Sequence, residues 1–356
     1  MSTLKTNAIL DASGGTTATV NGYTPTASNM AGRNRIINGN MAIDQRNAGA
    51  AITVNNNTAK FSCDRWYVQG ESTDGVFTVQ QSTTAPAGFT QSMLFTVTTV
   101  DASIGASQAY FFKQAIEGYN VADLGWGTAS AQTVTLSFWV RSSVTGTYGA
   151  SVLNSAANRS YPFTYTISSA NTWEQKTVTI AGDTSGTWAK DNTAGIQIYF
   201  NVGMGSTYLG AANAWAGATY LGATGQTNLI STSGATFYIT GVQLEKGSTA
   251  TDFEYRPYGA ELALCQRYYE TSVDATALVF SGQVTSGSAY YISGVFAVEK
   301  RIAPTMTFVA GTAISFPATN PTPSVATTRA YRAGTPAANA TTVGLLLYSF
   351  TAASEL

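Results

Sequence analysis

The sequence predicts an all-β protein: an antiparallel jelly-roll β-sandwich plus a smaller C-terminal β-domain, joined by a short helix and preceded by an extended N-terminal arm. Apolar and polar residues alternate with period two over many short segments, and Gly and Asn residues between these segments indicate turns. Strand-favouring Thr, Val, Tyr and Phe are abundant. Hydrophobic residues make up 44% of the 356 residues, which is enough apolar surface to offset chain entropy and excludes general disorder.

The sandwich is predicted over residues 34–258. The segment 106–116 fits either a strand or a helical turn, and residues 203–228 form a long small-residue loop of the kind that usually serves function or assembly. Many short one-sided strands separated by turns indicate two packed antiparallel sheets. The clearest alternation places the following residues on inward faces: Val134, Leu136, Phe138 and Val140, then Ile196, Ile198, Phe200 and Val202.

A helical connector is predicted over residues 259–270, because Leu262, Cys265 and Tyr269 share one helical face just after Pro257. Residues 271–356 then form the C-terminal β-domain, which we expect to be the exposed tip of the molecule. Its segment Val343–Phe350 is apolar on both faces, so it is either a central strand or a strand buried in an oligomer.

Residues 1–33 are polar and glycine-bearing, with too few large apolar residues to build a core. We interpret them as an arm that attaches to a partner, in preference to a disordered tail. The chain has no apolar signal segment and no apolar run near the ~20 residues that span a bilayer. These observations predict synthesis in the cytoplasm and no membrane insertion.

Composition excludes several function classes. Lys and Arg number 18 against 19 Asp and Glu, so there is no charge footprint for nucleic acid. The absence of histidine removes Ser-His-Asp and Cys-His catalysis and His-ligated metals. The two cysteines, Cys63 and Cys265, lie in apolar settings, which favours buried free thiols over a disulfide.

Glycoside hydrolysis needs only two carboxylates and is the one catalytic class left open. Asp252 and Glu254 share a strand face, and Asp183 and Asp191 flank Trp188. Paired carboxylates on a β-surface are usually solvated charge, so we predict no enzyme, no catalytic residues and no cofactor.

Carbohydrate binding is the positive chemical hypothesis, since sugars stack on aromatic rings and bond to polar side chains. Two strands supply this mixture on their polar faces, and they would form one sugar platform if they were neighbours. The alternative, which we weigh more heavily, is that these aromatics pack under a loop or at a subunit interface. The candidate ligand-binding residues are Trp139 and Arg141, with Gln197, Tyr199 and Asn201.

Three stretches carry a family resemblance: Asn34–Arg46 (NRIINGNMAIDQR), Asp64–Tyr67 (DRWY) and Gly241–Tyr269 (GVQLEKGSTATDFEYRPYGAELALCQRYY). Together they resemble the carbohydrate-binding-module-like β-sandwich of phage tail fibres and other virion appendage proteins. The likeness spans roughly residues 34–270. It implies that Asp64 and Arg65 pair near the sandwich edge, with Trp66 in the core. Such sandwiches often carry a structural calcium, for which carboxylates near Glu245 are candidates; the sequence leaves any metal unknown.

The resemblance implies a structural component of the virion: a tail fibre that adheres to host-surface polysaccharide, contacts other virion proteins through its arm and forms a homotrimer. The alternatives are a capsid decoration or head-fibre protein and a carbohydrate-active depolymerase module. The two-faced apolar strand and the short connector helix independently favour an oligomer.

Overall fold

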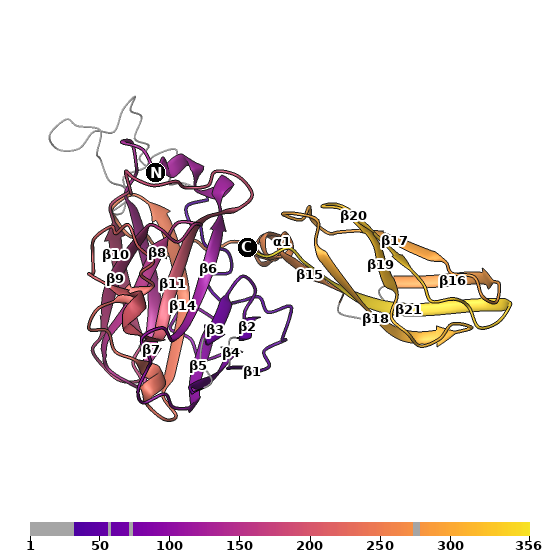
Figure 1. Cartoon of the computed structure of the whole chain (residues 1–356), viewed down its shortest axis with the longest axis horizontal. Helices are drawn as coiled ribbons and strands as arrows, with labels where there is room; N and C mark the ends of the chain where they lie inside the picture. The colour runs from indigo at the N-terminus through magenta and orange to yellow at the C-terminus, as the bar shows by residue number, and fades with distance from the viewer. Residues whose placement is uncertain (1–31, 56–57, 71–73, 273–277) are drawn as a thin grey trace, which may run out of the picture.

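The computed structural model describes residues 32–55, 58–70, 74–272 and 278–356. The predicted arm therefore lies almost wholly outside the described residues. The rest is all-β, as predicted, with many antiparallel strands and one α-helix, and it forms two units on either side of that helix (Figure 1). Within the described ranges, no helix is long and apolar enough to cross a membrane.

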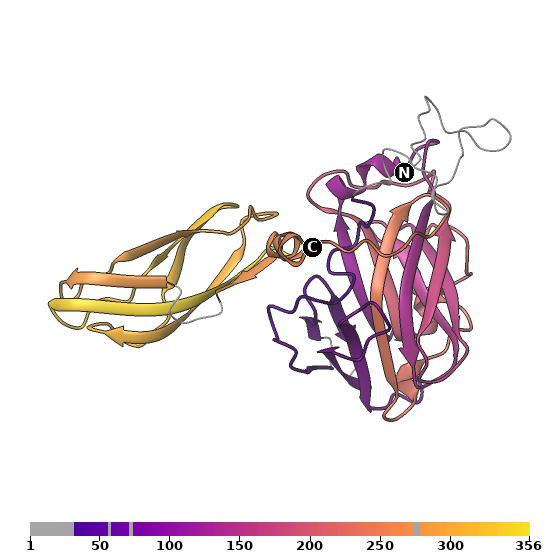
Figure 2. The same ribbon diagram turned by 180° about the vertical axis from the view of Figure 1, so that it is seen from behind.

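The larger unit is a sandwich of two six-stranded antiparallel sheets, which confirms the jelly-roll prediction (Figures 1 and 2). The β14 sheet has the order β1 (Ile52–Val54), β4 (Val76–Ser82), β5 (Ser92–Thr99), β14 (Thr236–Lys246), β7 (Val134–Ser142) and β10 (Glu174–Ile180). The β11 sheet has the order β2 (Thr58–Phe61), β3 (Tyr67–Gly70), β6 (Ala109–Glu117), β11 (Ala194–Met204), β8 (Gly146–Leu153) and β9 (Ser160–Ile167).

The core of the sandwich is aromatic. Phe112 of β6 stacks on Phe200 of β11 at 5.2 Å between ring centroids, and on the other sheet Phe95 lies 4.5 Å from Phe112. Phe138 meets Phe200 edge-on at 5.1 Å. The predicted inward residues of β7 and β11 are all buried here. The segment 106–116, which fits either a strand or a helical turn in the sequence, largely forms β6, which pairs with β11 in the middle of its sheet.

After the sandwich, α1 (Tyr258–Gln266) leads into β15 (Tyr269–Thr271). The helix is shorter than the predicted 259–270, because Tyr269 and Glu270 leave it to pair with the last strand. Cys265 packs with Ile37, Ile43 and Tyr268. Both cysteines are buried and free, as favoured from sequence, and burial raises the pKa of each thiol.

The C-terminal unit has its own core. β21 (Thr342–Ala353) pairs with β15, β16 (Leu278–Val284) and β18 (Thr305–Ile314). Opposite lie β17 (Tyr291–Val295), β20 (Ala330–Gly334) and β19 (Thr322–Ala326). The two-faced apolar segment is thus a central strand, whose Leu346, Tyr348 and Phe350 enter the core.

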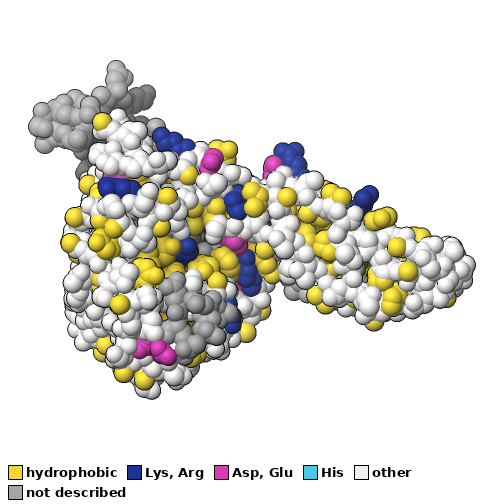
Figure 3. All heavy atoms as spheres, in the orientation of Figure 1, with side chains coloured by type: hydrophobic (Ala, Val, Ile, Leu, Met, Phe, Trp, Pro, Cys, Tyr) yellow, Lys and Arg dark blue, Asp and Glu magenta, His cyan; other side chains and the backbone are white. Residues whose placement is uncertain are grey.

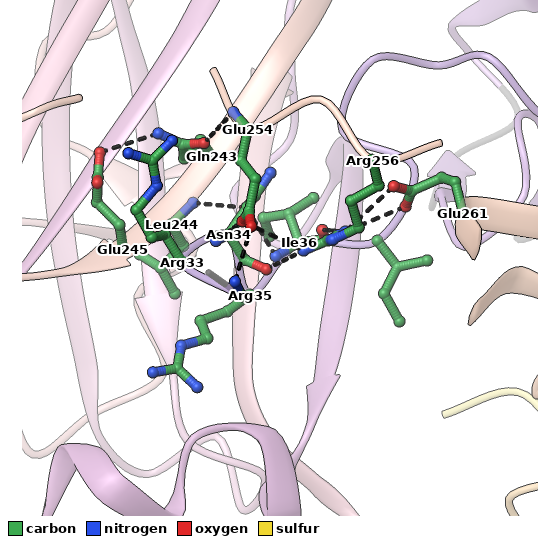
Figure 4. A network of polar contacts seen from close by, with 12 residues as sticks. Arg33, Asn34, Arg35, Ile36, Gln243, Leu244, Glu245, Glu254, Arg256 and Glu261 are labelled. Atoms are coloured by element: carbon green, nitrogen blue, oxygen red, sulfur yellow. Dashed lines mark hydrogen bonds and ion pairs between the residues drawn. The ribbon is translucent and has the colours of Figure 1, made fainter. Parts of the chain in front are cut away.

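The stretch around Glu254 fastens residues 32–38 to the sandwich (Figure 4). The Glu254 carboxylate accepts hydrogen bonds from the backbone N–H groups of Gly32 (2.8 Å) and Asn34 (2.7 Å). The Asn34 side chain accepts from the N–H of Leu244 and donates to the carbonyl of Val242. The two bonds of the Asn34 side chain satisfy backbone groups beside the bulge that interrupts the pairing of β14 with β7. The first described residues therefore belong to the sandwich.

Arg256 extends this fastening to the helix. Its guanidinium donates to the carbonyls of Asn34 and Ile36 and pairs with Glu261 of α1 at 3.2 Å. Glu261 in turn accepts from the N–H of Asn38 at 2.5 Å. Glu254, Arg256 and Glu261 of the quoted stretch therefore have a structural role.

A second network joins the two units. Trp66 is fully buried in the core, as the resemblance implies. Asp64 and Arg65, however, are not paired with each other, because they point to different partners. Asp64 faces Arg46 at 3.7 Å, and burial raises its pKa to about 6. Arg65 pairs with Glu355 near the C-terminus and lies 3.5 Å from the ring centroid of Tyr268.

Replacing Glu254 with Ala leaves two backbone N–H groups without their charged acceptor. We expect the free energy of unfolding to fall by about 2 kcal/mol. The matched control is Glu299→Ala, which breaks the ion pair of Glu299 with Arg329. Both side chains are exposed, that of Glu299 by 49% and that of Arg329 by 78%. Because solvent screens an exposed ion pair, that change should lower the free energy of unfolding much less than Glu254→Ala does. Chemical denaturation measures both; equal losses would contradict the structural role of Glu254.

Candidate functional site

The five predicted ligand-binding residues do not form one platform. Trp139 and Arg141 lie on β7 in the β14 sheet, whereas Gln197, Tyr199 and Asn201 lie on β11 in the β11 sheet. The inward residues of both strands meet in the core, so the polar faces point away from each other on opposite sides of the sandwich. Each face has to be considered by itself.

On the outer face of the β11 sheet, a lysine forms hydrogen bonds to two of the predicted residues. The Lys113 Nζ of β6 donates to the Gln197 Oε1 at 2.8 Å and to the Tyr199 hydroxyl at 2.9 Å. The same ammonium lies 4.9 Å from the ring centroid of Tyr199 and 5.1 Å from that of Tyr67 on β3. Cross-strand pairing of Tyr67, Lys113 and Tyr199 sets this arrangement.

The rings around Lys113 form a continuous floor. Phe61 meets Tyr67 edge-on at 5.6 Å, Tyr67 stacks on Phe111 at 6.3 Å, and Phe111 lies 5.1 Å from Tyr199. Phe111 and Tyr199 are buried, while Phe61, Tyr67 and Lys113 are half-buried. We call Phe61, Tyr67, Phe111, Lys113, Gln197 and Tyr199 the lysine face. Figure 3 shows hydrophobic side chains gathered around a basic one on this side of the sandwich.

Asn201 has a structural role beside the lysine face. It is fully buried, and its Nδ2 donates to the carbonyl of Leu221 at 2.8 Å. That bond holds part of the predicted loop, including β12 (Leu209–Gly210) and β13 (Gly222–Ala223), against the sheet. The loop thus borders the lysine face, and Asn201 is buried beneath it.

Outside the β14 sheet, Trp139 and Arg141 are half-buried. The Arg141 guanidinium lies 4.8 Å from the ring centroid of Tyr238 and donates to the carbonyl of Asn171. Trp173 meets Tyr238 edge-on at 6.0 Å. This is an aromatic surface, but its arginine is already stacked and bonded.

The carboxylates singled out from the sequence are engaged elsewhere. Asp183 accepts two hydrogen bonds from Arg159, both at 2.7 Å, and Asp191 accepts from Thr193. Glu245 accepts from the N–H and hydroxyl of Thr251. Among the described residues, no group of three or more Asp, Glu, Cys or His side chains is placed to hold a metal ion.

Sequence reasoning missed Lys113 and Tyr67. Lys113 lies in the segment left open between strand and helix. If that segment is taken as a strand, the alternation of Phe111 and Lys113 with buried Tyr110 and Phe112 places the lysine outward. Tyr67 ends the DRWY stretch, directly after the core Trp66. What joins them to Tyr199 is strand order, which no pattern in the sequence records.

No family model matches the chain, and no curated protein sequence matches it. Solved structures do. The enzymatically active domain of tailspike protein 4 of bacteriophage CBA120 aligns with 60% of this chain at 15% identity and a TM-score of 0.31, and the alignment covers 21% of that chain.

Two carbohydrate-binding modules align as well. The family 11 module from Clostridium thermocellum aligns with 58% of this chain and 98% of its own, at 10% identity and a TM-score of 0.28. The CBM22-1 xylan-binding domain of Paenibacillus barcinonensis Xyn10C aligns with 57% and 99%, at 9% identity and a TM-score of 0.26.

Trp139 and its neighbour Phe138 offer a test of which side chains support the fold. Phe138→Ala should cost about 3–5 kcal/mol, because it empties part of the core. Trp139→Ala should cost only about 1–2 kcal/mol, since its ring lies on the outer face and is half-exposed. Thermal and chemical unfolding of both variants measure the difference, and an equal loss would place Trp139 among the core residues.

Proposed function

We propose that this chain is a non-catalytic glycan-binding component of a phage particle, and that the lysine face holds the glycan. The observation that carries the proposal is the position of Lys113, whose ammonium lies beside two tyrosine rings and within hydrogen-bond distance of Gln197 and Tyr199. Half-exposed Tyr67 and Phe61 offer apolar ring surface beside these polar groups. A saccharide presents the complementary pattern of apolar ring faces and hydroxyls.

Binding without turnover fits the chemistry of this face. The lysine face as defined contains no carboxylate, whereas glycoside hydrolysis needs a pair of them. Asp183, Asp191, Glu245 and Glu254, considered from the sequence, accept hydrogen bonds elsewhere in the sandwich. We therefore favour adhesion over depolymerisation.

The place on the particle rests on the family resemblance of the three sequence stretches. In this proposal residues 1–31 attach the chain to other virion proteins, and copies associate as a trimer. Exposed apolar side chains on the C-terminal unit support association: Val295 is 79% exposed and Val325 46%, and both line one groove. A tail fibre is the assignment we favour, with a head fibre or capsid decoration protein as the alternative.

Lys113→Met should weaken binding to host-surface polysaccharide at least tenfold, since it removes the ammonium but keeps the stem. The matched control is Lys190→Met, which removes the same charge at an exposed position in a loop. A glycan array followed by titration calorimetry measures both variants. Equal affinity for wild type and Lys113→Met would exclude the lysine face. Release of reducing sugar by the wild type would instead show an enzyme.

Deletion of residues 1–31 should leave the melting temperature and the trimeric mass unchanged, but abolish incorporation into particles. The truncation stops before Gly32, whose N–H bonds to Glu254. Light scattering, calorimetry and immunoblots of purified particles give the three readouts. A monomeric mass for the full chain would refute the trimer, and normal incorporation of the truncated chain would refute attachment through the arm.

A further inference from the structure

A small cavity lies near the start of α1, outside the lysine face. It has a volume of about 230 Å³ and is bounded by the turn at Asn40, the loop at Phe89, and the segment from Tyr255 to Glu261. This volume is below the range of about 300–1,000 Å³ usual for drug-sized ligands, so it suits a single ring. Neither the glycan proposal nor the lysine face depends on this cavity.

Two tyrosines at the cavity expose large parts of their rings. Tyr255 is 55% exposed and Tyr258 64%. Tyr255 is held in place, because its ring contacts Phe89 at 5.5 Å and Phe253 at 4.9 Å, and its hydroxyl donates to the carbonyl of Gly88. A fixed, exposed ring beside a cavity offers a stacking surface at little cost in side-chain entropy.

One residue that lines the cavity, Asn40, carries an unsatisfied acceptor. The Oδ1 of Asn40 is buried and has no hydrogen-bond partner among the described residues. A buried acceptor left unpaired is unfavourable, and a hydroxyl donor entering the cavity would satisfy it. This observation is independent of the exposed tyrosines and points to a ligand that carries O–H groups.

The charged groups of the wall are already paired. Arg256 and Glu261 contact each other at 3.2 Å, and Arg256 also donates to the carbonyls of Asn34 and Ile36. A charged ligand would have to compete with that ion pair, whereas a neutral one would leave it intact. Glu261 still offers carboxylate lone pairs as further acceptors for hydroxyls.

We propose that this cavity binds one neutral pyranose unit, which stacks on Tyr258 beside the fixed ring of Tyr255 and donates a hydroxyl to the Oδ1 of Asn40. The chain then carries two separate saccharide sites, one on the lysine face and one near the start of α1. Two sites on one chain, multiplied by the copies on a particle, would raise the avidity for a repetitive glycan without tighter single contacts.

The test uses the full chain in the Lys113→Met background, so that binding at the lysine face does not contribute. The probes are the methyl glycosides of glucose, galactose, mannose and N-acetylglucosamine, observed by saturation-transfer NMR. We expect at least one probe to bind with a dissociation constant on the order of 1 mM, typical for a small polar ligand. If none binds, the proposal is overturned even if the lysine face proves correct.

Variants locate the site. Tyr258→Ala and Asn40→Ala should each weaken binding at least several-fold, and Tyr258→Phe should retain it, because the ring remains. The matched control is Tyr291→Ala, which removes a tyrosine of similar exposure (61%) from the C-terminal unit and should change nothing. Unchanged binding in both Tyr258→Ala and Asn40→Ala would place the sugar elsewhere and refute the assignment. Circular dichroism confirms that each variant is folded.

Discussion

The sandwich depends on hydrogen bonds that join residues 32–36 to β14 and to the segment that follows it. Glu254 and Arg256 satisfy backbone groups of residues 32–36, and Asn34 satisfies those of β14, so two segments more than 200 positions apart fix each other. Each bond satisfies a backbone group, and the two that Asn34 makes to Val242 and Leu244 lie beside the bulge between Thr240 and Gln243. Because Arg256 also reaches Glu261, the same contacts set where α1 begins.

On this frame, the two outer faces of the sandwich are chemically different. The β14 sheet exposes Trp139 and Tyr238 beside an arginine that is already bonded, whereas the β11 sheet gathers rings around a lysine. Near the helix, Tyr255 and Tyr258 form a third aromatic region. A weakly charged chain with many aromatics can thus carry several separate patches suited to uncharged, hydroxyl-rich partners.

Much of the fold could be predicted from the sequence, because alternation is a local signal. Val134, Leu136, Phe138 and Val140 enter the core as the alternation predicts, and Trp66 does so as the family resemblance implies. Sheet membership is not local, and therefore the sequence could not show that Trp139 and Tyr199 lie on opposite sides. For the same reason Asp64 and Arg65, adjacent in the chain, take partners from different units. Lys113 was missed because its strand looked ambiguous, and the cavity at Tyr258 was missed because three separate segments build it.

Both the first and the last residues of the C-terminal unit are attached to the sandwich. One attachment is covalent, through α1 and β15. The other is made by side chains: Arg65 pairs with Glu355, while Arg301 donates to the carbonyls of Ser354 and, across the junction, Asn192. A force that bends the distal end of this unit sideways would therefore act on two supports instead of one. The junction should resist torque better than a single covalent link would, and it should yield when the ion pairs of Glu355 with Arg65 and Arg46 separate.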